Sequence, residues 1–165
     1  MRTEKYVNDD DHRIVTEIAR KVRTAMITSR GADGKLTSRP MTSQQVDFDG
    51  TAWFFVSRTA DLVADIARDG QVNVGYAGSG SWLSLSGTAS VVDDRARKNE
   101  LWNEFVQAWF PNGPDDPDVV LLKVDADSAE YWNTPGGKPR ALFEMAKARV
   151  TGNRPDPGDN DTVDL

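Results

Sequence analysis

Apolar residues recur at every third or fourth position along residues 11–23, which is the spacing of one face of an amphipathic helix. The acidic run Asp9-Asp10-Asp11 suits the positive N-terminal end of that helix. Similar spacing predicts helices over residues 59–69, 93–109 and 138–150. The helix at 93–109 carries a stripe of large apolar side chains, Leu101, Trp102, Phe105, Val106 and Trp109.

Short apolar stretches between turn residues predict strands over residues 24–29, 35–47, 51–57, 71–76, 82–92 and 119–124. Tight turns are predicted at residues 31–34 and 49–50, and a turn region at residues 128–137. Gly87, inside one strand, indicates a bulge or a close backbone approach. The pattern of five or six antiparallel strands with two or three helices predicts a small barrel of the mostly-β or α+β class.

The sequence AWFPNGPDDP, residues 108–117, places two aromatic side chains directly before a turn rich in proline and acid. Trp109 and Phe110 are expected to pack back on the core while Pro111 and Gly113 turn the chain. The carboxylates that follow Gly113 are suitable ligands for a hard cation, but they lack the alternation and the distal glutamate of a calcium loop. We therefore interpret these carboxylates as turn formers, with no metal site: Asp115, Asp116 and Asp118.

The chain has 165 residues and a formal net charge of -6, with no cysteine. This length predicts one domain over residues 1–150, followed by a polar, acidic and disordered tail at 151–165. An acidic chain without a visible basic face is not expected to bind nucleic acid. No stretch approaches the ~20 apolar residues of a membrane span, and residues 1–13 contain no apolar signal core. We expect a soluble, cytoplasmic protein.

Catalytic groups of the common kinds are scarce in this sequence. The single histidine, His12, falls on the charged first helix, where a solvated side chain is expected. Without cysteine or a second histidine, the chain has little material for a serine or cysteine triad or for a histidine-rich metal site. Gly78-Ser79-Gly80 is too short for a dinucleotide fingerprint and predicts a turn.

Two short segments combine an arginine with hydroxyl side chains, Ser38 to Thr42 on a predicted strand and Ser57-Arg58-Thr59 where a strand meets a helix. An arginine beside the N–H groups of a helix start is a natural phosphate cradle. In the alternative interpretation, Thr59 only caps the helix and both arginines are solvated.

Several segments, taken in order, go beyond these local patterns. They are SRPMTSQ, a DG turn with WFFVS, VNVGY, WLSLSGTASVVDDR, ELW with AWFPNGPDDP, and VLLKVDADSAEYWN. Over residues 11–132 this ordered set resembles the general stress protein branch of the pyridoxamine 5'-phosphate oxidase-like, FMN-binding proteins.

The resemblance implies an antiparallel split β-barrel that forms a homodimer, with two sites for FMN, or in this branch FAD, at the subunit interface. A flavin ring requires flat apolar surface and a few fixed polar groups, and its phosphate requires cations or N–H donors. The implied cofactor residues are Arg39, Pro40, Met41, Thr42, Gln44, Phe55, Val56, Ser57, Arg58, Thr59, Trp82, Ser84 and Trp109. In this family Trp82 and Ser84 match positions at which the partner subunit reaches the flavin.

Two departures from the family pattern limit what the resemblance implies. Where related flavoproteins offer a serine and two cations to the phosphate, this chain has Ala60-Asp61-Leu62, and a carboxylate there would weaken phosphate binding. The C-terminal arginine and histidine motif of true pyridoxamine phosphate oxidases is also absent, and residues 138–152 do not replace it. Vitamin B6 oxidation is therefore not expected.

The leading functional hypothesis is a low-specificity, flavin-dependent oxidoreductase or flavin reductase linked to stress, with a nicotinamide as a candidate electron donor. No protein side chain is nominated as a catalytic acid or base, because hydride chemistry would belong to the cofactor. Two alternatives stay open. One is a deazaflavin-dependent reductase on the same fold, and the other is a degenerate barrel without cofactor that acts as a binding or structural module, which Ala60-Asp61-Leu62 would favour.

Overall fold

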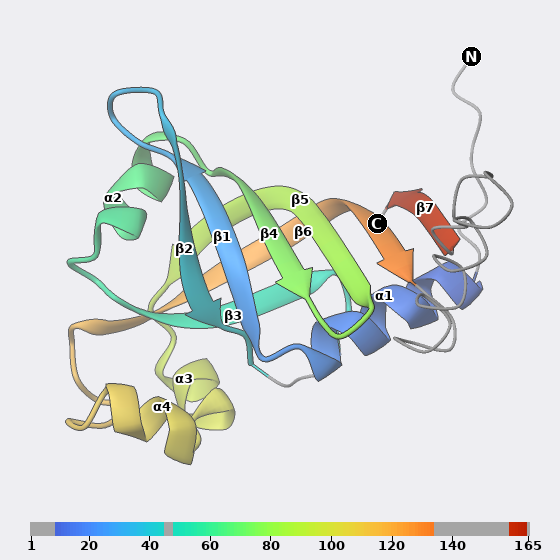
Figure 1. The fold of residues 1–165 in the computed structure, drawn as a ribbon. Coiled ribbons are helices and arrows are strands. Elements are labelled where there is room, and N and C mark those ends of the chain that lie inside the picture. The colour runs from blue at the N-terminus through green and yellow to red at the C-terminus, as the bar shows by residue number, and fades with distance from the viewer. Residues whose placement is uncertain (1–8, 45–47, 134–158, 165) are drawn as a thin grey trace, which may run out of the picture.

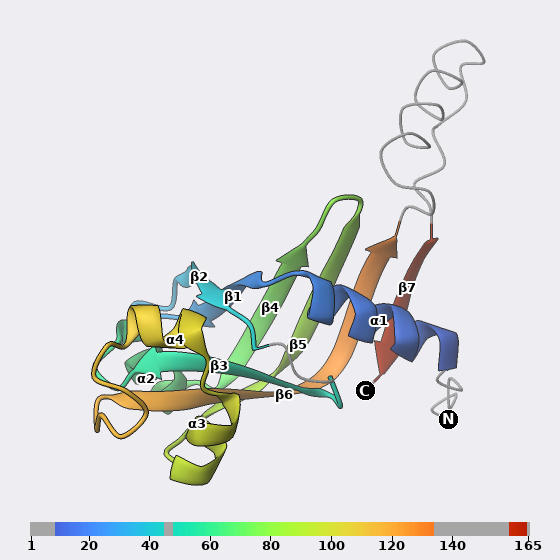
Figure 2. The same ribbon diagram turned by 90° about the horizontal axis from the view of Figure 1, so that it is seen from below.

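The computed structural model describes residues 9–44, 48–133 and 159–164. Seven strands form a single antiparallel sheet with the order β2-β1-β4-β5-β6-β3, and β7 pairs with β6 outside this path. Figure 1 and Figure 2 show that the strands curve into an open barrel, with α1 and α2 at opposite ends and α3 beside α4 on the outside. The elements are α1 (Asp9–Lys21), β1 (Thr24–Arg30), β2 (Leu36–Thr42), β3 (Thr51–Ser57), α2 (Asp61–Arg68), β4 (Gln71–Ala77), β5 (Ser81–Val92), α3 (Arg95–Leu101), α4 (Glu104–Trp109), β6 (Val119–Asn133) and β7 (Asp159–Asp164).

The antiparallel barrel predicted from the sequence is confirmed, and it is open along one seam. β2 pairs only with β1, and β3 pairs with β6, so these two strands face each other across a gap. The gap is bridged at one end, where Ser43 lies opposite Phe54 and the Gln44 N–H donates to the Trp53 carbonyl at 3.2 Å. Among the described residues, the sheet therefore has a split between β2 and β3 that no ladder closes.

The predicted irregularity at Gly87 is confirmed. The register of β5 against β6 shifts between Ser86 and Gly87, which is the signature of a β-bulge. A Cβ added at Gly87 would lie 2.1 Å from the Asp125 carbonyl oxygen, so only glycine allows this approach. The bulge divides β6 in two: residues 119–125 pair with β3, and residues 128–133 pair with β7.

Two apolar clusters fill the molecule. The larger lies inside the barrel and includes Phe54 and Val56 of β3. The smaller packs α3 and α4 against the outer side of β3 and β6, and includes Phe55, Leu101 and Val106. Because alternate side chains of a strand point to opposite faces, β3 is buried on both sides, as its continuous apolar run predicts.

The predicted single helix over residues 93–109 is wrong: the chain forms α3 and α4, with Trp102 and Asn103 between them. Trp102 is extended, with φ -65° and ψ 135°, and Asn103 caps α4 by accepting hydrogen bonds from two backbone N–H groups. Only part of the predicted apolar stripe is buried. Leu101 and Val106 pack on the core, whereas Phe105 and Trp109 stay exposed.

Three other expectations are corrected by the sheet. The strand predicted to start at residue 35 ends at Thr42 rather than near residue 47. The turn expected at residues 128–132 is the second half of β6, held by ladders to β5 and β7. Residues 159–164 of the expected disordered tail form β7, because the edge of β6 offers them a ladder.

Several other predictions concern residues that the structure does not describe. The helix over 138–150, the residue 134–137 turn and the segment 151–158 lie outside the described residues. The domain boundary at residue 150 stays a prediction. Within the described residues, no helix is both long enough and apolar enough to span a membrane.

Candidate functional site

A hollow of about 250 Å³ lies at the split of the sheet, between the facing edges of β2 and β3 and beneath α4. Most of the implied cofactor residues line it together: Pro40, Met41, Thr42, Gln44, Phe55, Val56, Ser57 and Trp109. The structure thus brings together residues that are far apart in the sequence. Whether a flavin occupies this hollow stays a proposal.

Aromatic side chains of α4 form the outer wall of the hollow. Trp109 is 71% exposed and Phe105 46% exposed, and both line the cavity. Trp109, expected beside a cofactor or on its own core, thus lines the hollow instead of packing in the core, and its contact with a cofactor stays a prediction. Three further residues line the hollow that the sequence does not mark as site residues, Phe105, Val106 and Phe110. The first two belong to the apolar stripe of residues 101–109, which is the signal that could have identified them.

Backbone polar groups of β2 also point into the split. Ser43 N–H donates to the Arg23 carbonyl at 2.8 Å, and bonded pairs alternate along an antiparallel ladder. Met41 is therefore bonded to β1, whereas Pro40 and Thr42 direct their backbone groups away from it. Pro40 has no N–H to lose, which suits this free side of the strand.

The same alternation applies to β3 on the other side of the split. Arg58 N–H donates to the Asp118 carbonyl at 2.7 Å, so Phe55 and Ser57 direct their backbone groups away from β6. The Thr42 N–H and the Phe55 carbonyl consequently both face the gap, beyond the single Ser43–Phe54 bridge. The hollow combines apolar walls with a backbone donor and a backbone acceptor.

A larger hollow of about 780 Å³ adjoins this one. The two share Thr42, Gln44 and Phe105. The larger hollow is more polar, because α3, α4 and the chain before β1 add Glu100, Glu104 and Arg23 to its wall.

Arg39 does not line either of these two hollows. It lies against α2, where it donates to Asp65 Oδ2 at 3.0 Å and to Ser29 Oγ at 2.9 Å. Asp65 is 4% exposed and also contacts Arg68 at 2.5 Å. This buried carboxylate holds Arg39, since an unpaired charge there would be costly. The implied role of Arg39 in flavin binding stays a prediction.

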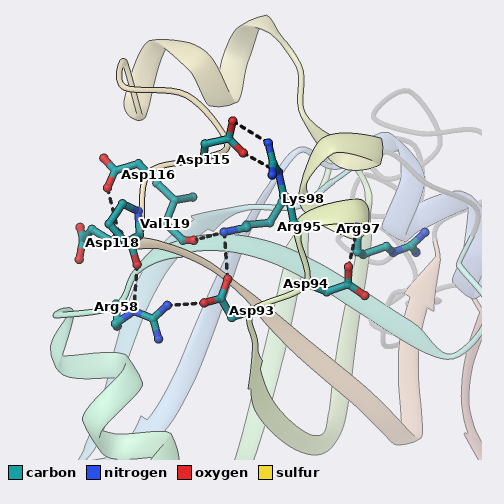
Figure 3. Close-up of polar contacts among 11 residues, drawn as sticks. Arg58, Asp93, Asp94, Arg95, Arg97, Lys98, Asp115, Asp116, Asp118 and Val119 are labelled. Carbon is teal, nitrogen blue, oxygen red and sulfur yellow. Dashed lines mark hydrogen bonds and ion pairs between the residues drawn. The ribbon is translucent and has the colours of Figure 1, made fainter.

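Arg58 is likewise held by partners other than a ligand, as Figure 3 shows. It donates to the Pro117 carbonyl at 2.9 Å and contacts Asp93 at 2.5 Å. Ser57 Oγ donates to Asp118 Oδ2 at 2.6 Å and lies 3.0 Å from Thr59 Oγ1. Residues 57–59, which were expected to bind a phosphate, thus connect the end of β3 to the loop after α4 by hydrogen bonds.

Lys98 adds to these connections from α3 (Figure 3). Its side chain is 6% exposed, and Nζ donates to Asp93 Oδ1 and to the Val119 carbonyl, each at 3.0 Å. The hydrogen bond from Lys98, and then that from Arg58, hold the pKa of Asp93 below its ordinary value. The stabilisation that Asp93 contributes is therefore complete above the ordinary aspartate pKa and is lost as the pH falls through the lowered one.

The acidic side chains of residues 111–118 bind within the loop, to α3 or, for Asp118, to Ser57 at the end of β3. Asp115 pairs with Arg95 at 2.8 Å. Asp116 accepts from the Asp118 N–H at 2.9 Å and from Asn112 at 3.0 Å, and these two hydrogen bonds, the backbone one first, lower the pKa of Asp116. Such contacts are those of a structured turn.

The start of α2 differs from the interpretation in which Thr59 caps it. The N-cap is Ala60, which offers no side-chain hydrogen bond. Asp61 is exposed, and Leu62, 2% exposed, belongs to the barrel core. The position at which the family would have its second cation is thus occupied by a core residue.

Trp82 and Ser84 lie on the outer face of β5 and line neither hollow of their own chain. Trp82 is 46% exposed, and Ser84 Oγ accepts a hydrogen bond from Asn73 at 2.7 Å.

Comparison with known proteins agrees with this architecture. The model of the family described as pyridoxamine 5'-phosphate oxidase like matches residues 10–156. A crystal structure assigned as general stress protein 26 from Jannaschia sp. CCS1 is 32% identical, covers 96% of this chain and 100% of its own, and superposes with a TM-score of 0.79.

Two further proteins are similar to this chain. The general stress FMN/FAD binding protein of Xanthomonas citri is 31% identical, with 76% of this chain and 92% of that one covered and a TM-score of 0.67. Protein bli-3 of Neurospora crassa is 29% identical over 140 residues, which span 78% of this chain and 67% of that protein. Both the ordered motifs and the split sheet are thereby explained: the chain belongs to the pyridoxamine 5'-phosphate oxidase-like family and has its split-barrel fold, with general stress proteins among its similar structures.

Proposed function

We propose that the hollow at the split binds the ring system of a flavin, FMN or FAD, and that the protein is a low-specificity flavin-dependent oxidoreductase or flavin reductase linked to stress. The observation that carries the proposal is the convergence of Pro40 to Thr42, Phe55 to Ser57 and Trp109 on one cavity. The FMN/FAD binding stress protein of Xanthomonas citri, similar in sequence and fold, supports it.

The chemistry of the walls suits a flat heterocycle with hydrogen-bonding edges. Phe55, Phe105 and Trp109 provide apolar surface, while the Thr42 N–H and the Phe55 carbonyl provide one donor and one acceptor. A volume of about 250 Å³ is just below the ~300–1,000 Å³ of whole-ligand pockets. We therefore propose that this hollow holds the ring and that the ribityl phosphate lies outside it.

A bound flavin would supply hydride transfer, and the protein would supply position, apolar surroundings and fixed dipoles. The electron donor that we propose is a reduced nicotinamide, and the larger hollow beside Thr42 and Gln44 gives a second molecule access to the same cavity. No side chain of the hollow is proposed as an acid or a base.

Titration of the purified protein with FMN, FAD and a deazaflavin, followed by fluorescence, tests this proposal. We expect FMN or FAD to bind, and Trp109→Ala to weaken binding about tenfold, the usual effect of losing one stacking aromatic ring. Its thermal midpoint should change little, because Trp109 is 71% exposed.

The matched control is Leu36→Ala, which removes another exposed apolar side chain, 66% exposed on β2, that lines neither hollow. It should leave flavin affinity within about twofold if the ring lies where we propose. A wild-type protein that binds none of the three compounds would instead support the non-enzymatic barrel. Loss of flavin absorbance on adding NADH or NADPH would establish the reductase activity.

We further propose that the protein is a homodimer that associates through the outer face of the sheet. A cross-strand row on this face runs from Met26, which is 44% exposed, through Gly75 to Ser84. Trp82 lies next to Ser84 on the same face of β5. These four residues are uncharged, as the centre of a protein interface usually is. The family position of Trp82 and Ser84 at the partner's flavin agrees with this arrangement.

Light scattering during size-exclusion chromatography tests the dimer. The wild type should have twice the mass of one chain, and Trp82→Arg should produce monomers, because two cations would be buried near the interface centre. His12→Arg, an exposed change on α1, is the control and should remain dimeric. A monomeric wild type would disprove this part of the proposal.

A further inference from the structure

Asn103 lies at the break between α3 and α4, and its side chain has an orientation that its partners determine. Oδ1 accepts hydrogen bonds from the Phe105 N–H at 3.0 Å and the Val106 N–H at 3.1 Å. Backbone N–H groups only donate, so the amide oxygen must face them. The amide nitrogen therefore points the other way, where it donates to Gln44 Oε1 at 3.0 Å and to the Leu101 carbonyl at 3.2 Å.

The orientation of Gln44 follows from that of Asn103. Since Nδ2 of Asn103 can only donate, Gln44 must present its oxygen to it and turn Nε2 elsewhere. Gln44 is 8% exposed and lines both hollows. Its Nε2 lies 3.5 Å from the Thr42 carbonyl, which is at the outer limit of a hydrogen bond and leaves donor capacity unused.

We propose that Asn103 is a positioning residue that sets the hydrogen-bonding polarity of the candidate site. Through the bond to Gln44 it makes the buried amide present an N–H donor, so the ligand atom at that place is an acceptor, such as a carbonyl oxygen or an unprotonated ring nitrogen. The identity of the ligand rests on the proposed flavin function. The relay from α4 to Asn103 to Gln44 is a property of the protein alone.

The variant Asn103→Asp separates this role from helix capping. Aspartate, asparagine and serine are similar N-caps, so α4 keeps its two backbone hydrogen bonds. The second oxygen of the introduced carboxylate, however, faces Gln44 Oε1 and the Leu101 carbonyl in place of a donor. The Gln44 amide then turns over, donates to that carboxylate oxygen, and presents its own oxygen to the hollow.

With FMN as the probe, we expect Asn103→Asp to raise the Kd about tenfold, because a buried acceptor then meets an acceptor. The visible absorption band of bound FMN should also shift relative to the wild type. The midpoint of thermal unfolding should lie within about 2 °C of that of Asn103→Ser, which also loses the hydrogen bond to the Leu101 carbonyl. A role limited to stability would therefore not separate these two variants in FMN binding. Asn103→Ser, which keeps the cap without the carboxylate, should weaken FMN binding less.

A Gln44→Leu background provides the decisive comparison. Without the amide of Gln44 there is nothing for residue 103 to orient, so adding Asn103→Asp should leave the FMN Kd unchanged. An equal loss in both backgrounds, or wild-type FMN affinity in Asn103→Asp alone, would overturn the proposal.

Failure of the flavin proposal leaves this inference testable. If the wild type binds no flavin, thermal unfolding of the ligand-free variants Asn103→Ser, Gln44→Leu and the double variant is compared instead. Groups in direct contact give non-additive shifts, so the double variant should lose less than the sum of the single ones. Additive shifts would show that Asn103 does not act on Gln44.

Discussion

Gly87→Ala is expected to prevent the protein from folding stably. The added methyl would lie 2.1 Å from the Asp125 carbonyl oxygen and 2.7 Å from the Ala126 Cα, and both are backbone atoms of the neighbouring strand β6. Relief requires β5 and β6 to separate at the bulge, which breaks their ladder in the middle. We expect a loss of more than about 4 kcal/mol, seen as insoluble expression or a non-cooperative thermal transition.

Gly75→Ala is the matched control in the adjacent strand β4. Its added Cβ would have its nearest neighbour, the Met26 carbonyl oxygen, at 3.9 Å, an ordinary contact. This variant should unfold cooperatively within a few degrees of the wild type. If Gly87→Ala did the same, the bulge would have to accommodate a side chain, and the close approach of β5 and β6 would be wrong.

Phe54→Ala is expected to remove about 3–5 kcal/mol from the free energy of unfolding, because the side chain is fully buried in the barrel core. In a domain of this size, that corresponds to a thermal midpoint lower by about 10 °C. Denaturant unfolding followed by circular dichroism measures the change.

Phe105→Ala removes the same atoms from α4, where the side chain is 46% exposed and lines the candidate site. It should leave the free energy of unfolding within about 1 kcal/mol and weaken flavin binding instead. The two phenylalanines thus separate the core from the site. Similar destabilisation by both changes would mean that Phe105 is a core residue and not a wall of the hollow.

The sequence predicts the strands best where a local pattern and the tertiary packing agree. Residues 51–57 are apolar throughout most of their length and form β3, buried on both faces. The second half of β6 is less readable, because Asp125, Asp127 and Glu130 interrupt its apolar run. Residues 128–133 form a strand because β5 and β7 supply ladders on both sides, which no local pattern reveals.

The helix break at Asn103 shows the same limit. The spacing of apolar residues continues through residues 93–109 and gives no sign of interruption. The amide of Asn103 caps α4 and binds Gln44, which is 59 residues away in the chain. A contact of that range is decided by the folded sheet and not by helical propensity.

The family resemblance identified residues that line the hollow, whereas the arginines identified from their charge lie outside it. Arginine next to hydroxyl groups is a reasonable phosphate pattern, but Arg39 and Arg58 each have a carboxylate partner, Asp65 and Asp93, from another part of the chain. Sequence reasoning identifies charges, whereas their pairing depends on which helices pack beside them.

The split between β2 and β3 also bears on the order in which the molecule assembles. β2 follows its partner β1 after a short turn. β3 can pair only after β6 has been reached, and the contact between Ser57 and Asp118 closes a loop of 61 residues. Closing long loops is the slow part of folding for such topologies. The two walls of the hollow are therefore expected to form at different times, and recovery of ligand binding during refolding would report the arrival of β6 rather than the collapse of the barrel.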